Sequence, residues 1–368
     1  MFIYTYTKSN YYKTEGDFLK NHFIKKIKLQ GPISVSEFMS DCLLSPKKGY
    51  YNLENTIGSK GDFITAPEIS QVFGELIGLS LVDYWHQSEK PKSPIITDLG
   101  GGKGTMLKDC LRAINKVDKN FRESIQPTFI ESSLTLKKKQ KHMIPDSKSF
   151  NDISDIPDGF LMLYANEFFD ALPIHQFIKI NANWHERLID IDLNNNLKFI
   201  YDNKPSIYEK ILPKNLKNNE VMEFSPPAIN IVSSLTKRVL AMGGIVLIID
   251  YALSDKDTFG SLQAVKGHEY IDPLSSPGNS DLSSKVDFST LSNVAKELNA
   301  NVHGPINQNL FLKNLGIELR CEQLIKQNPE YKDTIINDYN RLTSTNEMGD
   351  LFKAMAITPK NSIKPAGF

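Results

Sequence analysis

Asp98-Leu99-Gly100-Gly101-Gly102-Lys103-Gly104-Thr105 is the stretch that decides the fold of this 368-residue chain. The apolar run 94–97 precedes it, and the helix-like run 106–112 follows it. The order strand, glycine turn, helix is typical of the nucleoside- or phosphate-binding corner of an open α/β sheet. Three of the glycines alternate, at Gly100, Gly102 and Gly104. Because glycine lacks a Cβ and tolerates positive φ, a ligand can lie against this backbone.

The spacing of these glycines distinguishes between two cofactors. A dinucleotide fingerprint requires G-x-G-x-x-G/A, but its last position is Thr105 counted from Gly100, and Leu107 counted from Gly102. The carboxylate of Asp98 would repel a pyrophosphate and attract the ammonium and sulfonium of S-adenosylmethionine. We therefore expect S-adenosylmethionine and disfavour an NAD-dependent oxidoreductase. A glycine turn that only lets a helix pack on a strand remains the alternative.

Composition and charge exclude several classes of protein. Lys+Arg and Asp+Glu both number 43, so no net charge draws the chain to nucleic acid or to an anionic membrane. The hydrophobic content of 40% is enough for a sizeable core, and no apolar run reaches membrane-spanning length. Cys42, Cys110 and Cys321 are far apart, which predicts no metal site and no disulfide framework. The start, MFIYTYTKSNYYK, resembles neither a signal peptide nor an Arg-rich presequence.

Apolar runs after the glycine turn continue the strand–helix alternation. Strands are predicted at 127–130, near 148–150, at 160–165 and at 245–251. Glu131 ends the second strand, where an acid accepts hydrogen bonds from ribose hydroxyls, although it could equally sit at a helix N-terminus.

The end of strand 160–165 is unusually rich in functional groups. The segment 166–172 presents an amide at Asn166, carboxylates at Glu167 and Asp170, and the aromatic rings of Phe168 and Phe169. Ligands of open α/β sheets bind beyond the carboxyl ends of the strands. This segment is therefore predicted to hold a cationic or hydrogen-bonding group.

Segments outside the alternation are predicted to be additions to the core. We expect three parts: 1–90 with helices and a lid-like loop, 91–259 as the cofactor-binding core, and 260–368 completing the sheet and the substrate side. An antiparallel layer is expected as an insertion at 174–223. The tail is expected to contain a loop at 304–308 and an edge strand at 351–357.

The loop 58–70 is long and aromatic, which favours a lid or a substrate-binding wall over disorder. Asp62, Thr65 and Glu68 are its candidate substrate-side residues, and a rigid cap packed on the sheet is the alternative.

Several longer stretches resemble the MidA family over nearly the whole chain. They are GDFITAPEIS (61–70), QVFGELIG (71–78), DLGGGKGT (98–105), ANEFFDALPIHQF (165–177), LIIDY (247–251), DPLSSPGNSDLSSKVDF (272–288) and LFKAMAI (351–357). The resemblance implies a class I S-adenosylmethionine-dependent methyltransferase with a Rossmann-like sheet and helices on both of its faces. It also implies, for mitochondrial members, assembly of respiratory complex I and symmetric dimethylation of an arginine on the 49-kDa subunit.

The resemblance carries over residue by residue. Asp98, the glycines 100–104 and Thr105 match the cofactor motif, Glu131 the ribose-binding acid, and Asp152 would be the acid on the adenine side. The chain departs from the family at Asp98, Gly101 and Lys103, where Glu, Pro and Arg are usual. It also departs at Ala252, where a glycine often stands, and at Lys285, where the family has a histidine.

An arginine substrate gives the strand-end acids a role. Carboxylates accept the N–H donors of a guanidinium as a fork, so we expect Glu167, helped by Asp170 and Asn166, to hold it. Phe168 or Phe169 would form the wall beside it, and no metal is expected.

Several alternatives stay open at this level. The chain could be a non-catalytic assembly factor that binds S-adenosylmethionine, or a small-molecule methyltransferase. A bacterial protein would be cytoplasmic, and otherwise the mitochondrial matrix is expected. We expect a protein partner, no nucleic acid and no membrane insertion, and a homodimer is an open alternative.

Overall fold

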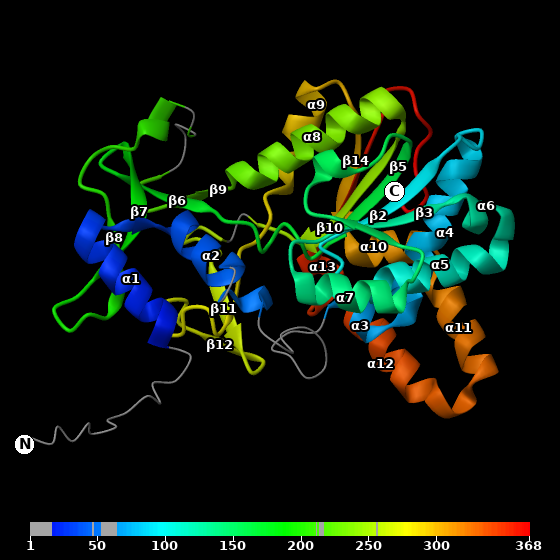
Figure 1. Ribbon diagram of the computed structural model, residues 1–368, viewed down its shortest axis with the longest axis horizontal. Helices are drawn as coiled ribbons and strands as arrows, with labels where there is room; N and C mark the ends of the chain where they lie inside the picture. Colours follow the sequence, from blue (N-terminus) through cyan, green and yellow to red (C-terminus); the bar gives the residue numbers. More distant parts are fainter. Residues whose placement is uncertain (1–16, 46–47, 53–64, 211, 213–216, 255–256) are drawn as a thin grey trace, which may run out of the picture.

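A seven-stranded mixed sheet forms the centre of the molecule, in the order β14-β15-β10-β5-β2-β3-β4 (Figure 1). The computed structural model describes residues 17–45, 48–52, 65–210, 212, 217–254 and 257–368. Neighbouring strands from β4 to β10 run parallel, and β15 is antiparallel to both of its neighbours. The predicted Rossmann-like α/β sheet is confirmed. Its strands are β2 Pro94–Leu99, β3 Gln126–Ile130, β4 Lys148–Phe150, β5 Phe160–Asn166, β10 Gly244–Tyr251, β14 Asn301–Asn307 and β15 Phe352–Thr358.

Helices cover both faces of this sheet, because its central strands are apolar on both sides. One core cluster joins the sheet to α4, α5, α6, α10 and α11, and a second joins its other face to α8 and α9. The helices of this part are α3 Ala66–Ile69, α4 Gln71–Gln87, α5 Thr105–Val117, α6 Lys119–Ser124, α7 Leu134–Met143, α8 Pro226–Met242, α9 Phe288–Glu297, α10 Gln308–Asn314, α11 Ile317–Gln327, α12 Lys332–Thr343 and α13 Met348–Leu351, with the 3-10 turns η2 Ile153–Asp155 and η4 Pro329–Tyr331.

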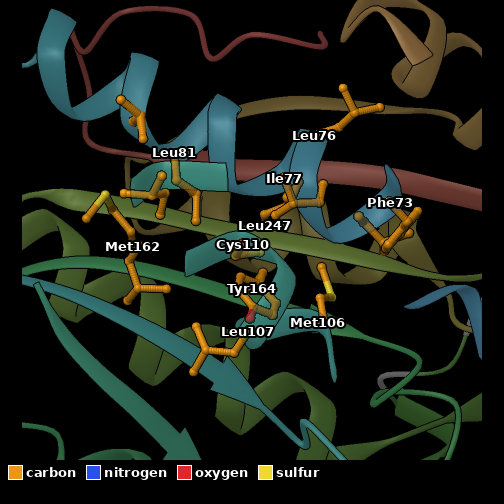
Figure 2. Packing of buried hydrophobic residues seen from close by; sticks show 14 of the residues in the cluster. Phe73, Leu76, Ile77, Leu81, Met106, Leu107, Cys110, Met162, Tyr164 and Leu247 are labelled. Atoms are coloured by element: carbon orange, nitrogen blue, oxygen red, sulfur yellow. The ribbon is translucent and has the colours of Figure 1, made fainter. Parts of the chain in front are cut away.

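Helices α4 and α5 pack unusually closely over the sheet (Figure 2). A Cβ added at Gly74 would lie 2.9 Å from the Cβ of Asp109, and one added at Gly78 would lie 2.7 Å from the carbonyl oxygen of Cys110. The Cys110 thiol in turn donates to the Gly74 carbonyl at 3.0 Å. Since α5 begins directly after the glycine turn, this contact fixes the direction in which the turn leaves the sheet.

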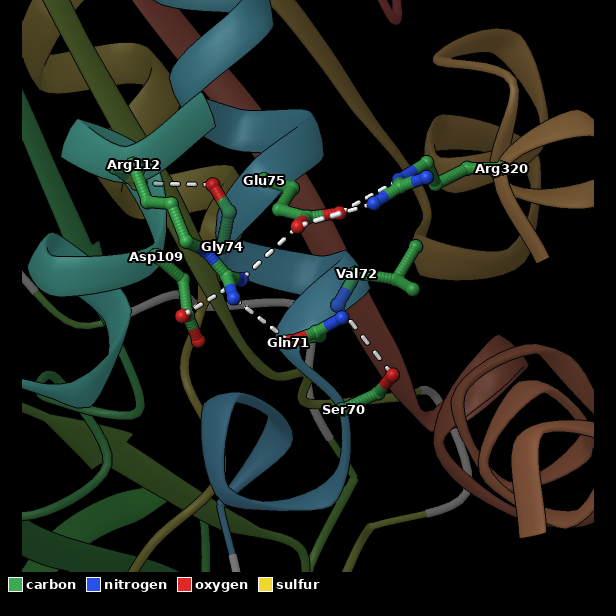
Figure 3. A network of polar contacts seen from close by, with 9 residues as sticks. Ser70, Gln71, Val72, Gly74, Glu75, Asp109, Arg112 and Arg320 are labelled. Atoms are coloured by element: carbon green, nitrogen blue, oxygen red, sulfur yellow. Dashed lines mark hydrogen bonds and ion pairs between the residues drawn. The ribbon is translucent and has the colours of Figure 1, made fainter. Parts of the chain in front are cut away.

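A buried ion network ties the C-terminal helices to this helix pair (Figure 3). Glu75 on α4 is only 3% exposed and accepts from Arg112 of α5 at 2.9 Å and from Nε of Arg320 of α11 at 2.7 Å. Arg112 also pairs with Asp109 at 2.9 Å, and burial raises the pKa of Asp109 to about 6. One carboxylate thereby holds helices that are separated by more than 200 residues in the chain.

A second lobe packs beside the main sheet and appears on the left of Figure 1. It consists of α1 Asp17–Gln30, β1 Ile33–Ser34, α2 Val35–Leu44, η1 Tyr50–Asn52, β6 His175–Ile180, β7 Asn183–Ile191, β8 Leu197–Tyr201, η3 Ile207–Lys210, β9 Val221–Phe224, β11 Gln263–Lys266, β12 Glu269–Ile271 and β13 Asp281–Ser283. Its main core joins the N-terminal helices, the strands that follow β5 and the strands that follow β10, for example through Phe23, Ile189 and Leu282. The predicted antiparallel strands within 174–201 are present as β6, β7 and β8.

The packing divides the chain differently from the predicted segments. Residues 66–87 belong to the core of the main sheet rather than to an N-terminal part, because α4 buries its apolar residues against α5. Residues 263–283 join the second lobe rather than the C-terminal part, through Ala264, Leu274 and Leu282. Linear proximity to a motif does not determine which apolar surface covers a segment.

Two predictions about the C-terminal strands are wrong. The expected loop at 304–308 lies largely in strand β14, whose register shifts between His303 and Ile306. Pro305 lies within this shift, and an edge strand tolerates a proline because one of its sides carries no ladder. The expected edge strand, β15, is therefore interior, between β14 and β10.

Within the described ranges, no helix combines the length and the apolar character needed to cross a bilayer. The three cysteines are buried and unpaired in disulfides.

Candidate functional site

A pocket of about 180 Å³ lies beyond the carboxyl ends of β2 and β5. At this point the sheet reverses its strand order, which is where open α/β sheets bind their ligands. Five regions contribute to its wall: the glycine turn, the segment after β3, the segment after β5, helix α3 and the second lobe. The lining residues include Asp98, Gly100, Gly101, Gly102, Thr105, Glu131, Thr65, Glu68, Asn166, Glu167, Phe168, Asp170, Tyr50, Tyr51 and Asp281.

The glycine turn forms a cradle with no room for side chains. Gly100, Gly102 and Gly104 have φ values of 73°, 50° and 92°, in the region that favours glycine. A Cβ at Gly100 would lie 2.5 Å from the ring of Phe168, and one at Gly101 would lie 2.5 Å from the carboxyl carbon of Asp98.

Asp98 is 2% exposed, at the end of β2. Its carboxylate accepts a hydrogen bond from the hydroxyl of Tyr164 at 3.2 Å. Burial raises the pKa of Asp98 to about 8, and the neighbouring charge of Glu131 adds to this increase. No described cationic side chain forms an ion pair with Asp98, so a cationic ligand would stabilise its charged form.

The acids predicted for ribose and adenine lie around a neighbouring pocket of about 600 Å³. Glu131 lines both pockets. Its Oε1 accepts from the backbone N–H of Ser133, the residue that caps α7, at 2.8 Å, so it also stabilises the start of that helix. Burial raises the pKa of Glu131. Asp152 caps η2 by accepting from the Ser154 N–H at 2.8 Å, and this hydrogen bond lowers the pKa of Asp152.

Helix α3 places Glu68 against the glycine turn. Its Oε1 accepts from the Thr105 hydroxyl at 2.6 Å, and its Oε2 lies 3.7 Å from Lys103 Nζ. Glu68 was a candidate for contact with either the substrate or the cofactor, and these contacts place it beside the cofactor turn. Thr65 lines the pocket, whereas Asp62 and the rest of loop 58–64 lie outside the described residues. Ala66 and Pro67 of the predicted loop are buried.

Glu167 and Asn166 face the pocket with unsatisfied acceptors. Glu167 has φ 51°, a backbone conformation that is rare and costly for a residue other than glycine. Its Oε1 accepts from the Ala66 N–H at 2.9 Å and from Asn166 Nδ2 at 3.1 Å. Glu167 Oε2 and Asn166 Oδ1 are buried with no hydrogen-bond partner among the described residues. Burial raises the pKa of Glu167 to about 8, and Asp250 adds to this increase.

Asp250, at the end of β10, holds the segment after β5 in place. Its Oδ2 accepts from the backbone N–H groups of Phe168 at 3.1 Å, Phe169 at 2.9 Å and Asp170 at 3.4 Å. Burial raises the pKa of Asp250 to about 7 although these donors oppose the increase. No role was predicted for this residue, although its place at a strand end could have indicated one.

The remaining predicted residues separate into pocket and core. Asp170 lines the pocket, and burial raises its pKa well above the usual range, with Asp250 and Asp281 adding to the effect. Phe168 lines both pockets. Phe169 is 3% exposed and packs in the core below the site, so Phe168 is the one of the two rings that lines the pocket.

Comparison with known proteins identifies the family. A family model of S-adenosyl-L-methionine-dependent methyltransferases matches residues 76–306. The chain belongs to this MidA-like methyltransferase family. The mitochondrial protein arginine methyltransferase NDUFAF7 of Xenopus laevis is 35% identical over 96% of this chain and 87% of its own length. The protein of that name from Homo sapiens is 33% identical over 93% of this chain and 84% of its own length.

A solved structure shares the whole fold of this methyltransferase. A protein from Burkholderia thailandensis, bound to S-adenosyl-homocysteine, superposes with a TM-score of 0.83 at 21% identity. The superposition covers 96% of this chain and 94% of the other. At this identity the likeness establishes the fold.

S-adenosylmethionine is the cofactor of this methyltransferase, as the glycine spacing and Asp98 predicted. The residues present fit the group, because Gly100 and Gly102, at φ values of 73° and 50°, leave the pocket side of the turn without side chains. Asp98 offers a buried negative charge, which suits a ligand carrying a sulfonium and an ammonium.

The lysine that replaces the family histidine lies in an ion pair. Lys285 Nζ is 2.6 Å from Asp257 and 5.1 Å from the centre of the Tyr251 ring. Lys285 does not line the pocket of about 180 Å³. Its contacts join the segment after β10 to the start of α9, which is a structural role.

Proposed function

We propose that this methyltransferase transfers methyl groups to the guanidinium of an arginine in a protein substrate. The observation that carries the proposal is the pair of buried, unpartnered acceptors, Glu167 Oε2 and Asn166 Oδ1, at the pocket. A guanidinium carries five N–H donors and no acceptor, so it is a suitable group to satisfy both atoms. The relatives named above are protein arginine methyltransferases, which supports the same substrate.

The charge of the pocket also favours a cation. Six carboxylates line it, and Lys103 is the one basic residue among the lining residues that the structure describes. Bringing several carboxylates together in a small buried space raises their pKa values, as for Glu167 and Asp170. Binding a cation would reverse these shifts and offset the cost of burying the acids.

The residues of the chain supply positioning and a proton acceptor. S-adenosylmethionine, when bound, supplies an electrophilic methyl whose bond to sulfur breaks as a bond to the arginine nitrogen forms. Glu167 and Asn166 orient that nitrogen by accepting its N–H donors, and positioning of this kind supplies much of the rate. The nitrogen that gains the methyl must lose one proton, which the Glu167 carboxylate accepts. The bound cation stabilises the charged form of this carboxylate, so it is ready to accept the proton.

For the protein substrate, we propose a subunit of respiratory complex I of the 49-kDa type, dimethylated symmetrically in the mitochondrial matrix during assembly. This extension rests on the family resemblance and on the mitochondrial names of the relatives.

Incubation of the purified protein with methyl-labelled S-adenosylmethionine and the isolated subunit tests the proposal, with mass spectrometry of the product. The expected result is dimethylarginine at one position. If no arginine of the subunit carries label, the proposal is refuted. That result would favour a non-catalytic assembly factor or a small-molecule enzyme.

A further inference from the structure

The second lobe contributes part of the wall of the methyl-transfer pocket. Tyr51 of η1 and Asp281, the first residue of β13, line the pocket together with the segment that follows β5. The Tyr51 hydroxyl donates to Asp281 Oδ1 at 3.2 Å, although the two residues are 230 positions apart. The two lobes therefore meet at the site, and the second lobe brings a carboxylate to it.

Electrostatics shows that Asp281 acts on the same space as the strand-end acids. The charge of Asp281 raises the pKa values of both Glu167 and Asp170. It also raises the pKa of Tyr51, which burial already places well above the usual range, so the phenol remains a donor. Three neighbouring carboxylates repel one another unless a cation lies among them.

The position of Asp281 is fixed from two sides. Strand β13 pairs with β11, where Asp281 lies opposite Val265. The Tyr51 ring packs edge-on against Tyr50 with centroids 5.4 Å apart, and Tyr50 is buried in the core of the second lobe. A carboxylate held this firmly is preorganised, so little entropy is lost when it binds a ligand.

We propose that Asp281 is a second carboxylate that contacts the substrate guanidinium, and that Tyr51 is the positioning residue that orients it. The inference rests on the proposed function. With acceptors from both lobes, the pocket would match the planar, five-donor fork of arginine. The compact three-donor ammonium of lysine would satisfy fewer of these acceptors. The second lobe would thus select arginine over lysine.

Steady-state kinetics on the full chain test this assignment. The probe substrates are a synthetic Gly-Arg-Gly repeat peptide and its lysine counterpart, alongside the isolated complex I subunit. The variants are Asp281→Asn and Tyr51→Phe, with Glu269→Gln as the matched control. Glu269 is an exposed acid of the same small sheet that does not line the pocket.

Asp281→Asn should raise KM for the arginine peptide at least about tenfold, equivalent to about 1.4 kcal/mol. Its kcat should stay within about threefold, and calorimetric binding of S-adenosylmethionine should be unchanged, since a substrate contact is lost while the cradle is kept. Tyr51→Phe should raise KM by roughly threefold to tenfold, because one hydrogen bond orients the acid. Glu269→Gln should change none of these values.

An unchanged KM in Asp281→Asn, with normal cofactor binding, would overturn the inference and leave the proposed function intact. A wild-type protein that labels no arginine in the peptide or the subunit would overturn both. If Asp281→Asn does not fold, Tyr51→Phe decides, since it keeps the ring and removes only the hydroxyl.

Discussion

Replacing Glu167 by Gln should abolish most activity while making the folded protein more stable. The change keeps the shape of the side chain. Its oxygen can still accept from the Ala66 N–H and from Asn166, which now lie at 2.9 and 3.1 Å. Only the charge and the acceptor at Oε2, which has no partner among the described residues, are removed. The substitution therefore separates the function of this carboxylate from its structural contacts.

The expected loss of activity follows from two effects of the carboxylate. A hydrogen bond to a charged group contributes about 1.5–3 kcal/mol, and loss of a general base typically costs about 10²- to 10⁴-fold in rate. We expect kcat/KM for an arginine substrate to fall at least about 100-fold. Binding of S-adenosylmethionine, measured by titration calorimetry, should be unchanged.

The expected gain in stability follows from the pKa of Glu167. This pKa is about 8 in the folded protein against 4.5 ordinarily, so between these values the folded state holds a proton that the unfolded chain has released. The free energy of unfolding therefore falls as pH rises from about 4.5 to about 8. The neutral Gln lacks this penalty, and we expect it to be more stable above pH 8 by about 1–3 kcal/mol. Below pH 4 the difference should vanish, because the carboxyl is then protonated in both states.

Thermal unfolding at pH 4 and pH 8.5 measures the gain in stability, and label transfer to arginine measures the loss of activity. Glu123→Gln, at an exposed position of α6, is the control and should change neither. A Glu167→Gln protein that binds the cofactor normally and methylates at the native rate would refute the assignment. Equal stability of the two proteins at pH 8.5 would refute the argument from burial.

Three further substitutions test other parts of the structure. Gly100→Ala should weaken S-adenosylmethionine binding at least about tenfold in calorimetry, because its methyl would lie 2.5 Å from the Phe168 ring; Gly267→Ala, also at positive φ but with nothing within 4 Å, should leave binding unchanged. Asp250→Asn should lower kcat/KM about 10- to 100-fold, with smaller effects on cofactor binding. The reason is that an amide cannot accept all four of the backbone hydrogen bonds that the carboxylate now accepts. An unchanged kcat/KM would contradict this role. Glu75→Gln should lower the free energy of unfolding in urea by about 2–4 kcal/mol, because two arginines lose their buried counter-ion. The control is Glu322→Gln at an exposed position of α11, and equal losses of stability in both variants would contradict the network.

Local sequence predicted the framework of this protein well. The runs that became β2, β3, β5 and β10 are mostly apolar and almost entirely buried, as expected for parallel strands covered on both faces. The alternating glycines indicated the turn, and the acid before them indicated a cationic ligand. These features were accessible because each depends on residues that are neighbours in the chain.

Other features depended on contacts that the sequence does not display. Strand β14 was missed because a glycine and a proline interrupt it, and only pairing with β15 makes it a strand. Phe168 and Phe169 are adjacent and chemically identical, yet one faces the pocket and the other the core.

The amino-acid sequence by itself determined the sheet, the cofactor corner and the presence of acids at the end of β5. Tertiary structure alone decided that Asp250 would hold the segment after β5, and that Tyr51 and Asp281 would close the pocket from the second lobe. The physical reason is the range of the interactions. A strand or a glycine turn is selected by backbone sterics and periodic burial within a few residues, whereas a pocket wall is assembled by packing surfaces that lie up to 230 positions apart.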